Sequence, residues 1–258
     1  MTGLSACIIT RNEQDRIRGC LESVAWCDEV LVVDSHSGDQ TRAVAEALGA
    51  RVIERDWPGY TEQREFTVRA ARHDWVLCID ADERVSEALR EEIEALRRAD
   101  FAGAAGFEMP RLTFYLGGWI RHGTWYPDRV LRLFDRRRGQ WRNNPAYPLH
   151  EKVTLDGPVA RLRHDLLHDP YRSFGDHLRT IDQYTTVMAE GLHGAGRRAT
   201  LADLTLRPGW EFLRFYLLKR GFLDGWRGLL LAYLHAHYVR MKYAKMFVLQ
   251  RTETKDQG

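Results

Sequence analysis

The sequence predicts an α/β protein with a mostly parallel sheet flanked by helices and a helical C-terminal extension. Two observations predict this fold class. From Leu4 to Leu96, short apolar runs alternate with apolar residues at helical spacing, which is typical of βαβ units. From Phe174 onward the periodicity is helical again. Because strands of a parallel sheet are buried on both faces, their runs are continuously apolar rather than alternating.

The first part of the chain contains four strand-helix pairs. We expect strands at Leu4–Thr10, Glu29–Asp34, Arg51–Glu54 and Asp74–Ile79. We expect helices at 17–24, at Thr41–Leu48 with Gly49 as its cap, at about 60–71, and after an N-cap at Ser86. Ligands of such sheets bind beyond the carboxyl ends of the strands. The residues that follow each strand are therefore the candidates for function.

The second part of the chain has a different texture. Strand patterns are expected at Phe107–Leu116, Arg129–Phe134, Lys152–Leu155 and Val159–Leu162. Helical patterns follow from Phe174, are interrupted at 194–196, and resume in a final helical region over Trp210–Leu249.

Composition and charge limit the classes of protein. The 258 residues are 44% hydrophobic and 29% charged, which is globular rather than disordered. The net charge of +2 says little by itself. We expect no nucleic-acid partner. Residues 207–251 contain nine Lys and Arg against two acids. That excess indicates either an anionic partner, such as a membrane surface or a phosphorylated substrate, or a solvated basic face.

Cysteine usage and the N-terminus indicate a cytoplasmic protein. The four cysteines have no metal-ligand spacing and fit a reduced compartment. No signal peptide is expected, because the chain runs almost directly into a strand at Leu4. Gly221–Val239 is interrupted by charged residues and histidines and makes a poor membrane span.

The Asp80-Ala81-Asp82 triplet follows the fourth buried strand. Side chains two apart in an extended segment point the same way, so the two carboxylates can converge. Such a pair suits Mg²⁺ or Mn²⁺, which would neutralise a departing diphosphate. The alternative is a pair of acids that cap the helix beginning near Ser86.

Other polar residues stand at strand ends or in loops. Asp34, followed by Ser35, can accept a hydrogen bond from a base or ribose hydroxyl, and the guanidinium groups of Arg11 and Arg64 match phosphate geometry. Glu151, between a loop and a strand, can act as a general base. His168, expected in a short polar loop, can complete a metal's coordination.

Taken together, these segments resemble a known family. The segments IITRNEQDRIRGCLESV, DEVLVVDSHSGDQTRAVAEALGARVIE and DWVLCIDADERV are similar to family 2 glycosyltransferases of the GT-A fold. WIRHGTWYPDRVLRLF and RGFLDGWRGLLLAYLHAHYVRMKYAK resemble the lipopolysaccharide-core β-glucosyltransferase subgroup. The likeness extends from about Leu4 to Leu249. It implies a catalytic domain over 1–170, with a nucleotide-binding half at 1–100 and an acceptor half at 101–170, before a helical region at 171–258.

The resemblance also implies a role for each candidate residue. The nucleotide-sugar would contact Thr10, Arg11, Asn12, Glu13, Asp34, Ser35, Arg64, Asp80 and Ala81. The divalent cation, Mg²⁺ or Mn²⁺, would be held by Asp82, Asp80 and His168. Glu151 would be the base that activates the acceptor hydroxyl, with Asp128 as the second candidate. The sequence departs from the subgroup at His36, where Gly is usual, and at Thr61 and Glu65, where Gly and Asn are usual.

The predicted reaction is an inverting transfer of a sugar, glucose by the resemblance, from a UDP-sugar to a lipopolysaccharide core or similar lipid-linked glycan. The enzyme would work in the cytoplasm of a bacterium, peripherally at the inner membrane. The basic and aromatic residues after Trp210 would contact the membrane or only pack on the catalytic domain. Alternatives are another cell-surface polysaccharide pathway, a haloacid-dehalogenase-type phosphatase, or a non-catalytic phosphosugar-binding or nucleic-acid-binding module. A nucleotide-dependent oxidoreductase is disfavoured, because no Gly-rich turn follows the first strand.

Overall fold

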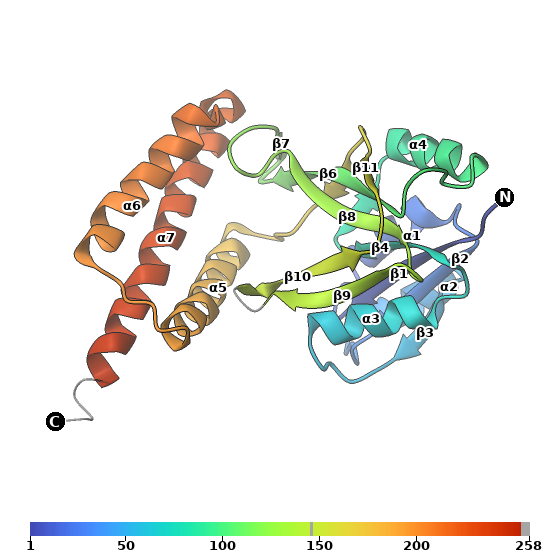
Figure 1. Ribbon diagram of the computed structural model, residues 1–258, viewed down its shortest axis with the longest axis horizontal. Helices are drawn as coiled ribbons and strands as arrows, with labels where there is room; N and C mark the ends of the chain where they lie inside the picture. The colour runs from blue at the N-terminus through green and yellow to red at the C-terminus, as the bar shows by residue number, and fades with distance from the viewer. Residues whose placement is uncertain (145–146, 254–258) are drawn as a thin grey trace. The chain divides into compact units, whose positions relative to one another are not determined.

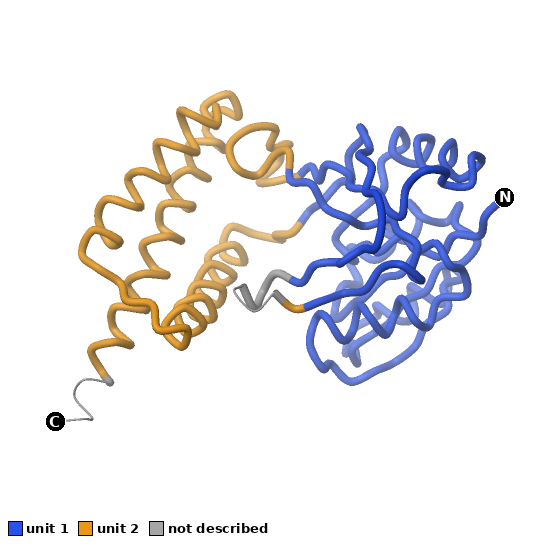
Figure 2. Tube along the Cα trace, in the orientation of Figure 1, with its two compact units in different colours: residues 1–112, 128–142, 151–169 blue, residues 113–127, 143–150, 170–258 orange. Residues whose placement is uncertain are grey.

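The structure is a computed structural model that describes residues 1–144 and 147–253 (Figure 1). Its contacts divide the chain into two compact units (Figure 2). Unit 1 comprises residues 1–112, 128–142 and 151–169, and unit 2 comprises 113–127, 143–150 and 170–258. The sequence places 113–127 in the first domain, whereas these residues cluster with the helices of unit 2.

Unit 1 begins with four parallel strands in the order β3-β2-β1-β4. The strands are β1 (Leu4–Thr10), β2 (Glu29–Asp34), β3 (Arg51–Glu54) and β4 (Trp75–Asp80). The helices that connect and follow them are α1 (Ile17–Val24), α2 (Thr41–Ala47), α3 (Tyr60–Ala70) and α4 (Glu87–Arg98). Ser86 caps α4 as predicted, because its hydroxyl accepts a hydrogen bond from the Leu89 amide at 3.3 Å. The α/β fold class is therefore confirmed.

Both faces of the parallel strands are covered, which explains their continuous apolar runs. Every residue of β1 is buried. Leu4, Ala6 and Ile8 pack in one cluster with residues of α1 and α4, and Cys7 packs in a second cluster with Val68 of α3. Among the described residues all four cysteines are free thiols, and Cys7, Cys20 and Cys78 are buried.

The sheet continues beyond β4 with mostly antiparallel pairs, in the order β4-β8-β6-β12-β5. These strands are β5 (Glu83–Val85), β6 (Gly106–Tyr115), β8 (Asp128–Asp135) and β12 (Leu166–His168), and β11 (Val159–Arg161) pairs with β6. A separate two-stranded sheet contains β9 (Gly139–Asn144) and β10 (Tyr147–Leu155).

Two site residues lie in strands where the sequence predicted loops. His168 ends β12, which pairs antiparallel with β5, and Glu151 lies within β10 rather than before it. β5, β7, β9 and β12 were not predicted. They are three to six residues long and partly polar. Such strands form because distant partners pair with them, and periodicity does not reveal that.

Unit 2 is mainly helical. The end of β6 pairs with β7 (Gly118–Ile120), and the helices are α5 (Phe174–Gly194), α6 (Leu201–Leu213) and α7 (Gly225–Glu253). A π-helical turn, η1 (Arg214–Leu218), and a 3₁₀ turn, η2 (Gly221–Asp224), join α6 to α7. The predicted final helical region is thus an antiparallel hairpin that begins at Leu201 (Figure 1). In the described part of the chain, no helix combines the length and apolarity needed to cross a bilayer.

Candidate functional site

The carboxyl ends of three parallel strands bring predicted site residues to one edge of the sheet. Thr10 at the end of β1 is in register with Asp34 at the end of β2, and Ile9 is in register with Asp80 at the end of β4. The Thr10, Asp34 and Asp80 positions are therefore neighbours. This is the edge at which the sequence predicted ligand binding.

The loops after β1 and β2 are tied together by hydrogen bonds. The Asn12 amide donates to Ser37 Oγ at 2.9 Å, and Asn12 Oδ1 accepts from the Gly38 amide at 2.9 Å. The Glu13 amide donates to Thr41 Oγ1 at 2.8 Å. Asp34 is fully buried and accepts from the Ser37 amide at 2.8 Å. The candidate nucleotide-binding residues of these loops thus form one preorganised surface.

The remaining nucleotide-site candidates lie along the same edge. Ser35 is buried and accepts a hydrogen bond from Gln63 Nε2 at 3.0 Å, whereas Arg11 is exposed. Ala81 is buried in the turn after β4. His36 has a φ of 55°, in the left-handed region that glycine adopts most readily. This conformation accounts for the glycine that is usual at position 36 in the subgroup, and nothing in the structure explains the histidine found here.

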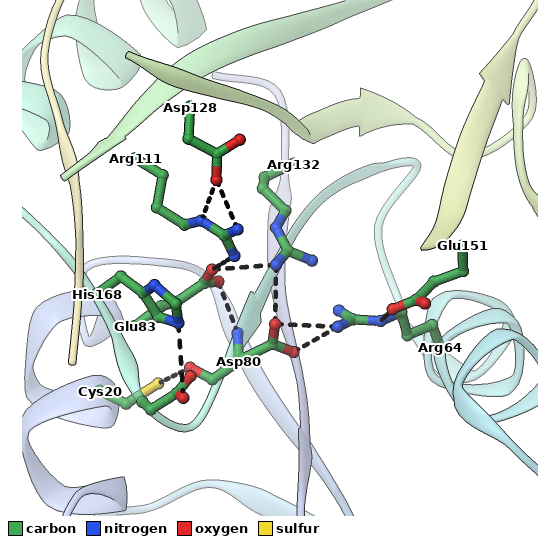
Figure 3. Close-up of polar contacts among 10 residues, drawn as sticks. Cys20, Arg64, Asp80, Glu83, Arg111, Asp128, Arg132, Glu151 and His168 are labelled. Carbon is green, nitrogen blue, oxygen red and sulfur yellow. Dashed lines mark hydrogen bonds and ion pairs between the residues drawn. The ribbon is translucent and has the colours of Figure 1, made fainter. Parts of the chain in front are cut away.

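A chain of alternating acidic and basic side chains crosses the site (Figure 3). Its seven members, in order, are Asp128, Arg111, Glu83, Arg132, Asp80, Arg64 and Glu151. We call it the ion-pair chain. Each arginine bridges two carboxylates, and the two candidate bases stand at its two ends. The side chains come from α3, β4, β5, β6, β8 and β10.

Two arginines form ion pairs with Asp80. Arg64 Nη2 lies 2.8 and 2.9 Å from its two carboxylate oxygens, and Arg132 Nη2 lies 2.8 Å from Oδ2. Burial alone would raise the pKa of Asp80, but the charges of Arg64 and Arg132 outweigh it and hold that pKa well below its usual range. Asp80 is therefore a permanent anion, and it does not serve as a cap for α4.

Glu83 lies at the centre of the ion-pair chain, and the sequence analysis assigned it no role in the site. Its side chain is fully buried. Oε1 accepts from Arg111 and Arg132, at 3.0 Å each, and Oε2 accepts from the Asp80 amide at 2.9 Å. The sequence offered one hint of this role. Glu83 directly follows the Asp80-Ala81-Asp82 triplet and stands two residues before the apolar Val85. Glu83 fixes the turn that carries the triplet.

Arg64 connects Asp80 to Glu151. Its Nε donates to Glu151 Oε1 at 3.1 Å, while Nη2 holds Asp80. The guanidinium also lies over the Trp141 ring, 4.8 Å from its centroid. The Arg64 side chain is 7% exposed, so it is a buried bridge rather than a surface arginine. The structure thus places the predicted base candidate Glu151 one side chain away from the triplet.

The other base candidate, Asp128, sits at the opposite end of the ion-pair chain. Arg111 donates to its Oδ2 from Nε at 2.9 Å and from Nη2 at 2.6 Å. The Asp128 side chain is 40% exposed, compared with 14% for Glu151. Glu151 is therefore the more enclosed of the two carboxylates.

Asp82 and His168 approach each other beside the ion-pair chain. His168 Nε2 lies 3.6 Å from Asp82 Oδ2, and the Asp169 amide donates to the Asp82 carbonyl at 3.0 Å. Within residues 1–144 and 147–253, no three His, Cys, Asp or Glu side chains form a metal cluster. Mg²⁺ in sites that bind phosphorylated substrates needs only one or two protein carboxylates, because substrate oxygens and water supply the rest. The Asp82 carboxylate fits that kind of site, and His168 lies beside it.

Three buried polar atoms among the described residues have no hydrogen-bond partner. They are Thr10 Oγ1, Arg132 Nε and Trp141 Nε1. Thr10 belongs to the strand edge described above, and the other two belong to side chains in or against the ion-pair chain. Unpartnered buried polar atoms are costly, and a hydrogen bond from a ligand would offset that cost. A separate hollow of about 620 Å³, lined by Arg69, Arg136 and neighbouring residues, contains none of the predicted site residues.

Comparisons with known proteins identify the family of this chain. The family model described as Glycosyl transferase family 2 matches residues 5–147. An uncharacterized glycosyltransferase of Rickettsia felis is 30% identical, over 95% of this chain and 90% of its own length. The lipopolysaccharide core biosynthesis glycosyltransferase LpsC of Rhizobium meliloti is 30% identical, over 93% of each chain.

Solved structures also align with the chain. Staphylococcus aureus TarS (residues 1–349) aligns over 99% of this chain and 92% of its own, with 16% identity and a TM-score of 0.48. Glucosyl-3-phosphoglycerate synthase of Mycobacterium tuberculosis, in complex with Mn²⁺, UDP and its product, aligns over 45% of each chain with 26% identity and a TM-score of 0.35. These scores are low, so the assignment depends on the sequence relatives. The chain belongs to glycosyl transferase family 2, and its α/β architecture is the GT-A fold of that family.

Proposed function

We propose that this glycosyltransferase is an inverting enzyme that moves glucose from a UDP-sugar to a hydroxyl of a lipopolysaccharide core or similar lipid-linked glycan. One observation carries the mechanistic part of the proposal. Arg64 binds Asp80 of the triplet and Glu151 at once, at 2.8 Å and 3.1 Å. A donor-side carboxylate and a base are thereby held in one rigid frame.

The donor would bind along the edge formed by β1, β2 and β4. The uridine and ribose would contact Asp34, Ser35 and the loop of Thr10, Arg11, Asn12 and Glu13. The unpartnered Thr10 Oγ1 supports this placement, because a nucleotide can supply the missing hydrogen bond. Arg64 and Arg132 already pair with Asp80 at the strand end, so the diphosphate would depend on the divalent cation for compensating positive charge.

The reaction would be a single displacement. Glu151 accepts the proton of the acceptor hydroxyl as its oxygen attacks the anomeric carbon from the face opposite the leaving group. The new carbon–oxygen bond forms while the bond to the diphosphate oxygen breaks, and UDP departs with the electron pair. Arg64 donates a hydrogen bond to Glu151 through Nε, which orients the carboxylate of the base. The reaction needs no covalent sugar–enzyme intermediate.

A divalent cation, Mg²⁺ or Mn²⁺, would be held by Asp82 and His168, with Asp80 close by in the same turn. When bound, it would supply positive charge to the leaving diphosphate. The protein's own residues keep the Asp82 backbone in place through the Asp169 amide, at 3.0 Å from the Asp82 carbonyl.

The acceptor half of the proposal is supported by the relative LpsC, which is named for lipopolysaccharide core biosynthesis. Its resemblance over 93% of each chain favours a lipid-linked core glycan over another cell-surface polysaccharide, which stays the alternative. Such an acceptor would place the enzyme peripherally at the cytoplasmic face of the inner membrane. A haloacid-dehalogenase-type phosphatase is disfavoured, because its nucleophilic aspartate would be Asp80, which two arginines already bind.

A donor panel tests the reaction. The protein is incubated with UDP-, GDP- and ADP-sugars, with Mn²⁺ or Mg²⁺ and a heptose-containing core acceptor, and release of nucleoside diphosphate is measured. We expect UDP-glucose to give the highest rate. Absence of release from every donor would refute the proposal.

Paired variants test the base. Glu151→Gln should lower kcat by about 10²–10⁴-fold, because the proton acceptor is lost while the shape is kept. Asp128→Asn is the matched control, since the same ion-pair chain contains it at its other end, and it should retain most of the activity. The opposite pattern would assign the base to Asp128.

A further inference from the structure

Unit 2 exposes large apolar side chains along the hairpin of α6 and α7. Six of them define what we call the hairpin face: Leu206, Trp210, Leu213, Leu217, Trp226 and Tyr233. Leu206 is 72% exposed, Tyr233 60%, Trp226 58% and Trp210 56%. Large apolar side chains that are this exposed and recur along one helical hairpin indicate a binding surface.

The spacing of these residues places them in stripes. Leu206, Trp210, Leu213 and Leu217 recur at intervals of four, three and four, which is one face of a helix through α6 and η1. Trp226 and Tyr233 are seven residues apart on α7. The Tyr233 ring lies 4.9 Å from the Phe212 ring of α6, so the stripes meet where the helices pack together. Figure 1 shows α6 and α7 running side by side.

Unopposed positive charge lies at the turn of the hairpin. Lys219 and Arg220 are exposed, and within the described part of the chain no acid forms an ion pair with either of them. Nearby acids have other contacts: Glu211 pairs with Arg214 at 2.7 Å, and Asp224 lies 2.9 Å from His122 Nδ1. The turn therefore attracts anions, and the apolar stripes begin beside it.

We propose that the hairpin face docks on an anionic phospholipid bilayer. Trp and Tyr suit the headgroup region because each has an apolar ring and a polar N–H or O–H. The leucines would insert to the acyl boundary, and Lys219 and Arg220 would contact lipid phosphates. Charge complementarity is the reason to prefer a lipid surface over a second copy of this chain, which would bring like charges together. The inference assigns a surface and a lipid chemistry, and binding does not require sugar transfer.

Vesicle co-sedimentation of the full-length chain tests this docking. Vesicles contain either phosphatidylcholine alone or phosphatidylcholine with phosphatidylglycerol. Each basic residue near an anionic bilayer contributes about fivefold to binding, so Lys219→Ser with Arg220→Ser should weaken binding to anionic vesicles about thirtyfold. Trp210→Ser with Trp226→Ser should weaken binding to both kinds of vesicle. These side chains are mostly exposed, so folding should survive, which circular dichroism checks.

Matched controls lie in unit 1. Arg18→Gln with Arg98→Gln removes two exposed cations, and Leu48→Ser with Val159→Ser removes two exposed apolar side chains. Both controls should bind vesicles like the unmodified chain. Equal binding by every variant would overturn the proposal. So would concentration-dependent dimerisation in light scattering that the Trp210/Trp226 variant abolishes while vesicle binding stays unchanged, because the face would then be an interface between copies. The donor panel is unaffected by either outcome, so the two proposals fail independently.

Discussion

Removing the Glu83 carboxylate should destabilise the protein far more than removing the carboxylate at the end of the same ion-pair chain. Glu83→Ala deletes two charge-assisted hydrogen bonds, from Arg111 and Arg132, and leaves the Asp80 amide without its acceptor. The Glu83 side chain is fully buried and that of Arg132 is 7% exposed, so water cannot replace the lost contacts. Loss of one partner from a buried ion pair costs about 3–5 kcal/mol.

A sharper test compares this buried carboxylate with an exposed carboxylate of the same ion-pair chain. Asp128→Ala removes a carboxylate that is 40% exposed, and the cost should be below about 1 kcal/mol because solvent screens the pair. Glu22→Ala is a neutral control, since Glu22 pairs with Arg18 on the open surface of α1. Urea unfolding at pH 7 measures all three. Similar losses for Glu83→Ala and Asp128→Ala would refute the view that burial sets the strength of the ion-pair chain.

Three further outcomes follow from the structure. Chelation of divalent cations should abolish activity, and added Mn²⁺ should restore it. Asp82→Asn should raise the metal concentration that gives the half-maximal rate, whereas the control Asp39→Asn should leave that concentration unchanged. Identical metal titrations for the two variants would show that Asp82 does not hold the metal. Ser86→Ala should lower the unfolding free energy by about 1 kcal/mol through loss of the α4 cap, with Ser86→Asn close to the unmodified protein, and no difference between them in thermal melts would contradict the capping role. Burial lowers the pKa of His177 to about 4, so the folded state favours the neutral ring. The stabilisation from the neutral ring is fully present above about pH 6.5 and is lost as pH falls toward 4, by roughly 3 kcal/mol. The free energy of unfolding in urea should therefore fall less between pH 7 and pH 4.5 for His177→Phe than for the unmodified chain.

The parallel half of the fold was predictable because its signals are local. β1, β2 and β3 begin and end at the predicted residues, since each is a continuous apolar run bounded by polar residues. The strands of Glu83 and His168 escaped prediction because their pairing with each other depends on residues more than 80 positions apart. The same holds for the arrangement of the site. The sequence identified Asp80, Arg64 and Glu151 as separate candidates, but only the fold reveals that Arg64 joins the other two.

The expectation that the Asp80 and Asp82 side chains point the same way also depended on local reasoning. Extended geometry would align them, but β4 ends at Asp80 and a turn follows. Asp80 then meets Arg64 and Arg132, while Asp82 meets His168. The contacts of Asp80 are set by Arg64 of α3 and Arg132 of β8. The residues next to the triplet in sequence do not reveal these contacts.

The ion-pair chain also has a consequence for how the protein acquires activity. Its links join residues far apart in sequence, such as Arg64 with Glu151, 87 positions away, and Arg132 with Asp80, 52 positions away. Contacts of this kind close only after the intervening chain has ordered, and they are slow to form compared with helices and neighbouring parallel strands. A nascent chain that stops before β10 would contain the residues of its parallel strands and its triplet, yet it would lack Glu151, the proposed base. With Glu151 as the proposed base, competence for sugar transfer would be acquired late in folding.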